Sequence, residues 1–97
     1  MLLKLGVDIS RLNRNIRRAL SVVDAVFLDH NQEPILTSTY EGNHSAGSLH
    51  YANDAFDLRL PDDNRLDIVT RIRERLGKDF DVIIEYDHIH IEYDPKP

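Results

Sequence analysis

Hydrophobic residues recur at three- and four-residue steps in two stretches of the chain, which is the spacing of an amphipathic helix. The first stretch predicts a helix over residues 9–29, with Asp8 or Ser10 as its N-cap. Its apolar stripe consists of Ile9, Leu12, Ile16, Ala19, Val23 and Val26. The second stretch predicts a helix over residues 61–77, because proline and aspartates open it and Gly77 ends it. The predicted stripe of this helix consists of Leu66, Val69, Ile72 and Leu76.

Four shorter segments are rich in β-branched and aromatic residues or alternate between apolar and polar positions, as strands do. They cover residues 34–40, 55–60, 82–86 and 88–93. Two helices and about four strands with few parallel crossovers predict a small α+β domain with a mainly antiparallel sheet. At 97 residues the chain is expected to be a single domain over residues 1–97.

Charge and composition restrict the function classes. The net charge of −5 argues against nucleic-acid binding and against attraction to an anionic membrane. The first ten residues hold one basic residue and a short apolar run, which predicts neither a signal peptide nor a membrane span. The chain contains no cysteine, so any stabilisation beyond its core must come from a metal or a partner. The arginines at 11, 14, 17 and 18 are interpreted as the solvated side of the first helix.

The histidines raise the question of a metal site. The chain has five of them: His30, His44, His50, His88 and His90. His30 and His44 fall in predicted turns and are interpreted as surface residues. His88 and His90 are two apart on one strand and therefore share a face. His50 and Asp57 are seven apart, and together with a histidine of this pair they offer the His, Asp and His ligands of a three-ligand zinc site, although two histidines also share a strand by chance.

Two segments carry a resemblance to a known family. The segment "SLHYANDAFD" (residues 48–57) resembles the S-x-H-x-x-G-x-A-x-D motif of the zinc D,D-peptidases, and "DHIHIEYD" (residues 87–94) resembles their second motif. That family includes D-Ala-D-Ala carboxypeptidases and dipeptidases and the L-alanyl-D-glutamate endopeptidases of phage endolysins. The likeness covers residues 34–94 and implies a Hedgehog/DD-peptidase-like fold.

The resemblance also implies roles for individual residues. His50, Asp57 and His90 would hold a zinc ion that activates a water molecule. Asp87 would be the general base, and His88 would either stabilise the oxyanion or orient a ligand. Because Asp87 and His90 lie three apart, both reach one site only if the chain turns at residues 86–88, which predicts an antiparallel hairpin. The candidate substrate-binding residues are Ser48, which holds the motif loop, and Arg59.

Two positions depart from the family pattern. Asn53 stands where the first motif has glycine, and asparagine tolerates the left-handed backbone that glycine adopts. Glu41 stands where many members have a substrate-binding arginine. Either another arginine such as Arg59 replaces it, or the substrate differs, or the protein binds zinc without cleaving peptides.

The function that the resemblance implies is zinc-dependent hydrolysis of a peptide bond in peptidoglycan stem peptides, by a carboxypeptidase or an endopeptidase. One alternative is a catalytically silent zinc-binding domain or a structural component of a phage particle. A further alternative is an interaction domain without a metal. The expected partner is a peptidoglycan peptide, with no nucleic acid and no membrane insertion. The expected location is cytoplasmic as synthesised, with access to the cell wall after lysis or by non-classical export.

Overall fold

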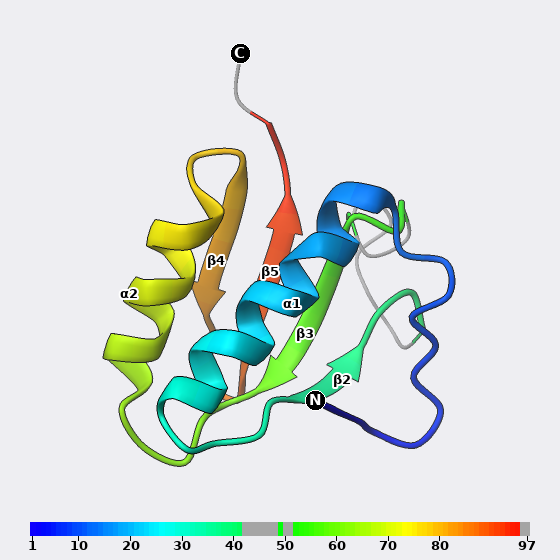
Figure 1. Ribbon diagram of the computed structural model, residues 1–97. Coiled ribbons are helices and arrows are strands. Elements are labelled where there is room, and N and C mark those ends of the chain that lie inside the picture. Colours follow the sequence, from blue (N-terminus) through cyan, green and yellow to red (C-terminus); the bar gives the residue numbers. More distant parts are fainter. Residues whose placement is uncertain (42–48, 50–51, 96–97) are drawn as a thin grey trace.

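Two helices pack on one face of a five-stranded sheet in the computed structural model of the chain, which describes residues 1–41, 49 and 52–95 (Figure 1). The helices are α1 (Arg14–Asp29) and α2 (Arg65–Leu76). In chain order, the strands are β1 (Leu2–Leu3), β2 (Ile35–Ser38), β3 (Ala55–Arg59), β4 (Phe80–Ile84) and β5 (His88–Tyr93). Their order in the sheet is β1-β2-β3-β5-β4, and only the β1–β2 pair is parallel. The predicted α+β class with a mainly antiparallel sheet is therefore confirmed.

Alternation along the central strands separates the core from the other face of the sheet. Phe56 and Leu58 of β3 lie opposite Ile91 and Ile89 of β5, and all four side chains are fully buried in the core against the helices. Successive strand residues point to opposite faces. The residues between them, including Asp57 and His90, therefore point to the face turned away from the helices, which we call the outer face.

The first helix begins five residues later than its hydrophobic pattern predicts. The Ser10 backbone N–H donates to Asp8 Oδ1 at 2.8 Å, so Asp8 stabilises a local turn instead of capping the helix. Asn13 is the N-cap, and its side chain bonds to the segment before β3 and makes no capping bond to the helix. Leu12 is buried in the core although its backbone is not helical. The apolar spacing before Arg14 therefore reflects burial and does not indicate a helix.

The second helix is shorter than predicted, because it begins at Arg65 after Asn64 in the left-handed region. Leu66 was predicted to lie on its apolar stripe and is instead 76% exposed, whereas Ile68 is fully buried. The inward face is thus formed by Ile68, Val69 and Ile72. Gly77 ends the helix at φ +82°, as predicted from its permissive backbone.

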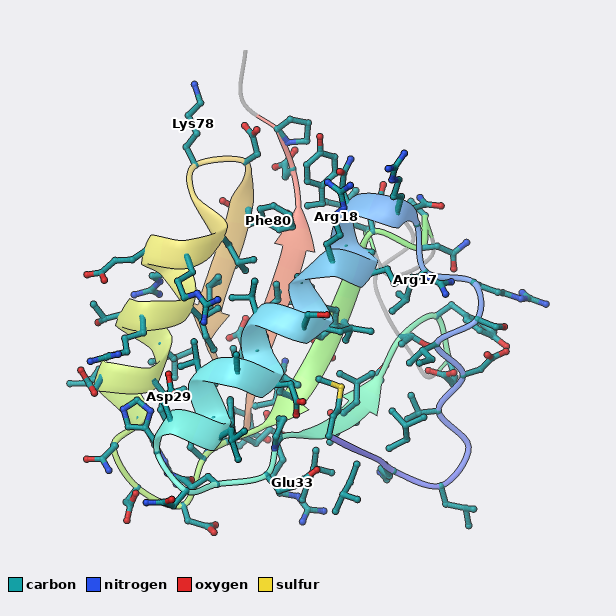
Figure 2. The ribbon with its side chains drawn as sticks, viewed as in Figure 1. Arg17, Arg18, Asp29, Glu33, Lys78 and Phe80 are labelled. Atoms are coloured by element: carbon teal, nitrogen blue, oxygen red, sulfur yellow. The ribbon has the colours of Figure 1, made fainter. Side chains whose placement is uncertain are left out.

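The arginines near the start of α1 are exposed, in agreement with the solvated face predicted for them. Figure 2 shows Arg17 and Arg18 at this end of the helix and Asp29 at the other end. The Arg17 guanidinium donates to the carbonyl oxygens of Ser10 and Leu12 at 2.9 and 3.1 Å, so it also holds the preceding loop. Among the described residues, no helix has both the length and the apolar character needed to span a membrane.

Candidate functional site

The register of β3 and β5 brings two of the predicted zinc ligands together. Asp57 lies directly opposite His90, and the Nδ1 atom of His90 is 3.0 Å from Oδ1 of Asp57. Both side chains are largely enclosed, with 12% and 15% of their surface exposed. Residues 33 positions apart in the sequence are thus joined on the outer face by strand pairing alone.

His90 lies between two carboxylates. Its Nε2 atom is 2.7 Å from Oε1 of Glu92, which follows two residues later on the same face of β5. Burial lowers the pKa of His90, but hydrogen bonds to Asp57 and Glu92, together with their charges, raise it by more, so the pKa lies above its usual value. The site therefore stabilises positive charge at the position of this imidazole.

The predicted hairpin is present and carries the two candidate catalytic residues. Strands β4 and β5 pair antiparallel, and the Glu85 backbone N–H donates to the His88 carbonyl at 2.8 Å across the turn. Asp87 lies in this turn and is exposed, and its Oδ1 atom is 2.6 Å from Nδ1 of His88. The Nε2 atom of His88 is 3.8 Å from Oδ1 of Asp57. His88 thus stands between Asp87 and Asp57.

A cavity of about 370 Å³ opens beside these residues. Its lining consists of Lys4, Thr37, Asp57, Arg59, Asp87 and His88. Arg59 lies opposite His88 in the β3–β5 register, one step along the outer face from the Asp57–His90 pair. The candidate substrate-binding arginine and both candidate catalytic residues therefore border the same cavity as a predicted zinc ligand.

The loop that carries the first motif is only partly described. Ser48 and His50 lie outside the described residues, as does His44. Asn53 has φ +63°, so it adopts the left-handed conformation expected where the motif has glycine. The Asn13 side chain donates to the Ala52 carbonyl at 3.1 Å and to Oδ1 of Asp54 at 2.7 Å. The start of α1 therefore holds the end of this loop.

Glu41 has a structural function at the position where the family has arginine. Its carboxylate accepts hydrogen bonds from the backbone N–H groups of Asp8 and Thr39, at 2.8 and 2.6 Å. It also lies 2.8 Å from the Thr39 hydroxyl, whose single proton has the Asp8 carbonyl as a second acceptor at 2.7 Å. Burial raises the pKa of Glu41, but these hydrogen bonds lower it by more, which leaves a net decrease. This carboxylate ties the N-terminal loop to the end of β2.

The Asp57–His90 pair offers two donor types that zinc binds, at a spacing close to that of two zinc ligands. Zinc binds imidazole nitrogen and carboxylate oxygen at about 2.1 Å, which places two ligand atoms of a tetrahedral site about 3.4 Å apart. The 3.0 Å between Nδ1 of His90 and Oδ1 of Asp57 is slightly shorter, as expected for two atoms in a hydrogen bond. A small separation of the two side chains would accommodate the ion.

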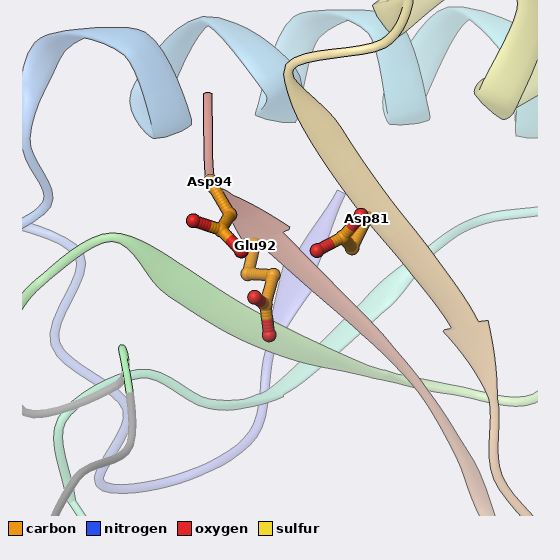
Figure 3. Close-up of side chains that lie close together, drawn as sticks. All are labelled: Asp81, Glu92 and Asp94. Carbon is orange, nitrogen blue, oxygen red and sulfur yellow. The ribbon is translucent and has the colours of Figure 1, made fainter. Parts of the chain in front are cut away.

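A second group of carboxylates lies nearby. Asp81, Glu92 and Asp94 have oxygen atoms within 4.8 Å of one another, and Figure 3 shows them gathered between β4 and the end of β5. Within the described ranges, this is the only set of three or more histidine, aspartate and glutamate side chains that close together. It contains no nitrogen ligand and Asp94 is exposed, so it does not indicate zinc.

Sequence reasoning did not predict two residues of the site, Glu92 and Lys4. Glu92 had a detectable signal, because it follows His90 by two residues and must share its face on a strand. Lys4 had none, since it reaches the cavity through the parallel pairing of β1 with β2, which joins residues far apart in the chain.

His30, interpreted as a surface residue, contacts Asp67 of α2 through Nε2 at 2.6 Å and the Val26 carbonyl through Nδ1 at 2.9 Å.

Comparisons with known proteins found no matching family model, no matching curated protein and no matching solved structure.

Proposed function

We propose that this domain is a zinc-dependent peptidase that hydrolyses a peptide bond in peptidoglycan stem peptides. The observation that carries the proposal is the pairing of Asp57 with His90 on the outer face, with Nδ1 and Oδ1 3.0 Å apart. His50 of the first motif would be the third protein ligand. The left-handed backbone of Asn53 supports the reading of residues 48–57 as a motif whose turn requires that conformation.

The chain's own residues would carry the proton and bind the substrate. Bound zinc supplies a Lewis acid that lowers the pKa of a water molecule and polarises the scissile carbonyl. Asp87 would accept the proton of the attacking water and pass it to the leaving amine. His88 is held by Asp87 at 2.6 Å and, with both ring nitrogens protonated, would donate from Nε2 toward negative charge in the cavity. Arg59 and Lys4 border this cavity as positively charged residues suited to an anionic stem peptide.

A second candidate is a zinc-binding domain without catalytic activity. The observation that favours it is the use of Glu41 within the fold, because the family's arginine has no counterpart at that position. Arg59 must then supply the missing contact for catalysis to occur. Turnover on purified wall fragments separates the two candidates, since both bind zinc.

The first experiment loads the protein with zinc and incubates it with peptidoglycan fragments, and mass spectrometry then identifies the products. Cleavage of a stem peptide that is abolished by a chelator and restored by zinc is the expected result. A protein that purifies without metal and shows no rise in melting temperature on zinc addition contradicts both candidates, because a metal that binds the folded state must stabilise it.

Two variants separate the base from the ligands. Asp87→Asn is expected to retain zinc and the fold and to lower kcat by roughly a hundredfold or more, the scale for loss of a general base. His90→Ala is expected to lose zinc and stability together. Equal loss of metal from both variants would make Asp87 a ligand, and full activity of Asp87→Asn would remove it from the mechanism.

A further inference from the structure

The imidazole of His90 has a carboxylate at each ring nitrogen, and the proposed function uses only one of them. Nδ1 faces Asp57 at 3.0 Å, and Nε2 faces Glu92 at 2.7 Å. The side chain of Glu92 is 19% exposed, so solvent reaches this contact only in part. Since a hydrogen bond is stronger in such surroundings than in water, the contact can fix the orientation of the ring.

We propose that Glu92 is a positioning residue that holds the N–H of His90 on Nε2 and so presents the lone pair of Nδ1 to the metal. The metal part of this inference rests on the proposed function, whereas the tautomer part does not. Glu92 itself would not bind the ion, because its oxygen contacts the ring nitrogen that points away from Asp57.

The reason lies in the number of protons. A neutral imidazole carries one N–H group, so it can donate to Asp57 or to Glu92 but not to both. The shorter contact, to Glu92, favours the proton on Nε2. The lone pair of Nδ1 then faces a carboxylate oxygen of Asp57, which is repulsive unless the ring gains a second proton or a cation lies between the two atoms. A zinc ion would provide that cation, and carboxylate partners of ligating histidines have this effect in metal sites generally.

The strand geometry fixes Glu92 for this task. Glu92 lies two residues after His90 on β5, and the neighbouring backbone N–H of Tyr93 donates to the Asp54 carbonyl at 2.8 Å. Across the sheet, Asp81 of β4 lies opposite Glu92 and belongs to the same group of carboxylates. The variant Asp81→Asn therefore changes the charge beside Glu92 while keeping the His90–Glu92 contact, which makes it a matched control.

The test combines two measurements on the full chain. Nitrogen NMR of the metal-free protein, at a pH where His90 is neutral, reports which ring nitrogen carries the proton. A competing chelating dye reports the affinity for zinc. In the wild type and in Asp81→Asn, we expect the proton on Nε2. In Glu92→Ala, we expect it on Nδ1, where it donates to Asp57, and a zinc affinity about 10- to 100-fold weaker. Glu92→Gln keeps an acceptor and is expected to lose less than about tenfold.

The outcomes are distinguishable. Glu92→Ala with the wild-type tautomer and zinc affinity overturns the inference. Loss of all bound zinc from Glu92→Ala, as from His90→Ala, also overturns it, because Glu92 would then be a ligand. If the wild type binds no zinc but the tautomer still changes in Glu92→Ala, the proposed function fails while the positioning of His90 by Glu92 stands.

Discussion

Replacing Glu41 with alanine should destabilise the fold by far more than a surface carboxylate usually does. The carboxylate accepts two backbone N–H bonds and shares the proton of the Thr39 hydroxyl with the Asp8 carbonyl. Thr39 is 1% exposed, so loss of Glu41 leaves its buried backbone N–H without this acceptor, at about 1–3 kcal/mol, whereas its hydroxyl can still donate to the Asp8 carbonyl. The backbone N–H of Asp8 is less buried, so water can replace Glu41 as its acceptor, and loss of that hydrogen bond adds only about 1 kcal/mol. The expected decrease in unfolding free energy is therefore about 2–4 kcal/mol.

Urea denaturation monitored by circular dichroism measures this difference directly. For a domain of this size, such a loss lowers the melting temperature by roughly 10–25 °C. Glu85→Ala is the matched control, because Glu85 is exposed in the β4–β5 turn and its backbone hydrogen bond is kept. Its effect should stay within about 0.5 kcal/mol. A Glu41→Ala variant as stable as Glu85→Ala would refute the reasoning.

The same contact predicts a dependence on pH. Because the folded-state pKa of Glu41 is lowered, the ionised carboxylate contributes stability above its usual pKa, and this contribution is lost as pH falls through the lowered value. The difference between wild type and Glu41→Gln should therefore narrow as the solution becomes acidic. Glu41→Arg, which would introduce the arginine of the family that the sequence resembles, should destabilise the fold, because a guanidinium cannot accept these hydrogen bonds. A constant difference across the acidic range would show that the charge of Glu41 is not involved.

The remaining predictions concern the motif loop and the helix contact. The free energy of unfolding of Asn53→Gly should stay within about 0.5 kcal/mol of the wild-type value, whereas that of Asn53→Ala should fall by about 1–2 kcal/mol. The reason is that alanine is strained in the left-handed conformation that residue 53 adopts. Equal stabilities of the two variants in urea denaturation would contradict this. The hydrogen bonds of His30 to the Val26 carbonyl and to Asp67 raise its pKa, so they stabilise the fold below the usual pKa of histidine and lose this effect as pH rises through the raised value. Asp67→Asn should lower the pKa of His30 in an NMR titration, and an unchanged titration would exclude this contact in solution.

Local pattern predicted the two helices and the strands around the turn at residues 85–87. The antiparallel hairpin of β4 and β5 followed from the roles that the family resemblance implies for Asp87 and His90, and the left-handed Asn53 followed from the glycine at that position of the motif. Element ends were less accurate, because tertiary contacts set them: α1 starts at Arg14 since Asn13 bonds to Ala52 and Asp54 instead of continuing a helix. The strand β1 was missed because two residues carry no periodic signal and pair with a strand more than thirty positions away.

The candidate site could be predicted as a set of residues but not as a set of contacts. The spacing of His88 and His90 placed both on one face, which the structure confirms, and the resemblance added Asp57. Which nitrogen of His90 faces Asp57 depends on ring orientation, and no sequence pattern specifies it. The placement of Asp87 against His88 at 2.6 Å likewise depends on the backbone of a three-residue turn, beyond the reach of residue spacing.

One strand register creates both the core and the site. The pairing that sets Phe56 against Ile91 and Leu58 against Ile89 also sets Asp57 against His90, because the three pairs are consecutive on β3 and β5. A shift of either strand by one residue would turn its polar side chain into the core and its apolar ones outward. Burial of the four apolar side chains is worth about 1.5–3 kcal/mol each. It therefore stabilises this register against the cost of desolvating a carboxylate and an imidazole on a partly enclosed face. The chemistry of the outer face is thus positioned by the hydrophobic residues behind it, and the Asp57–His90 distance is a property of the core as much as of the site.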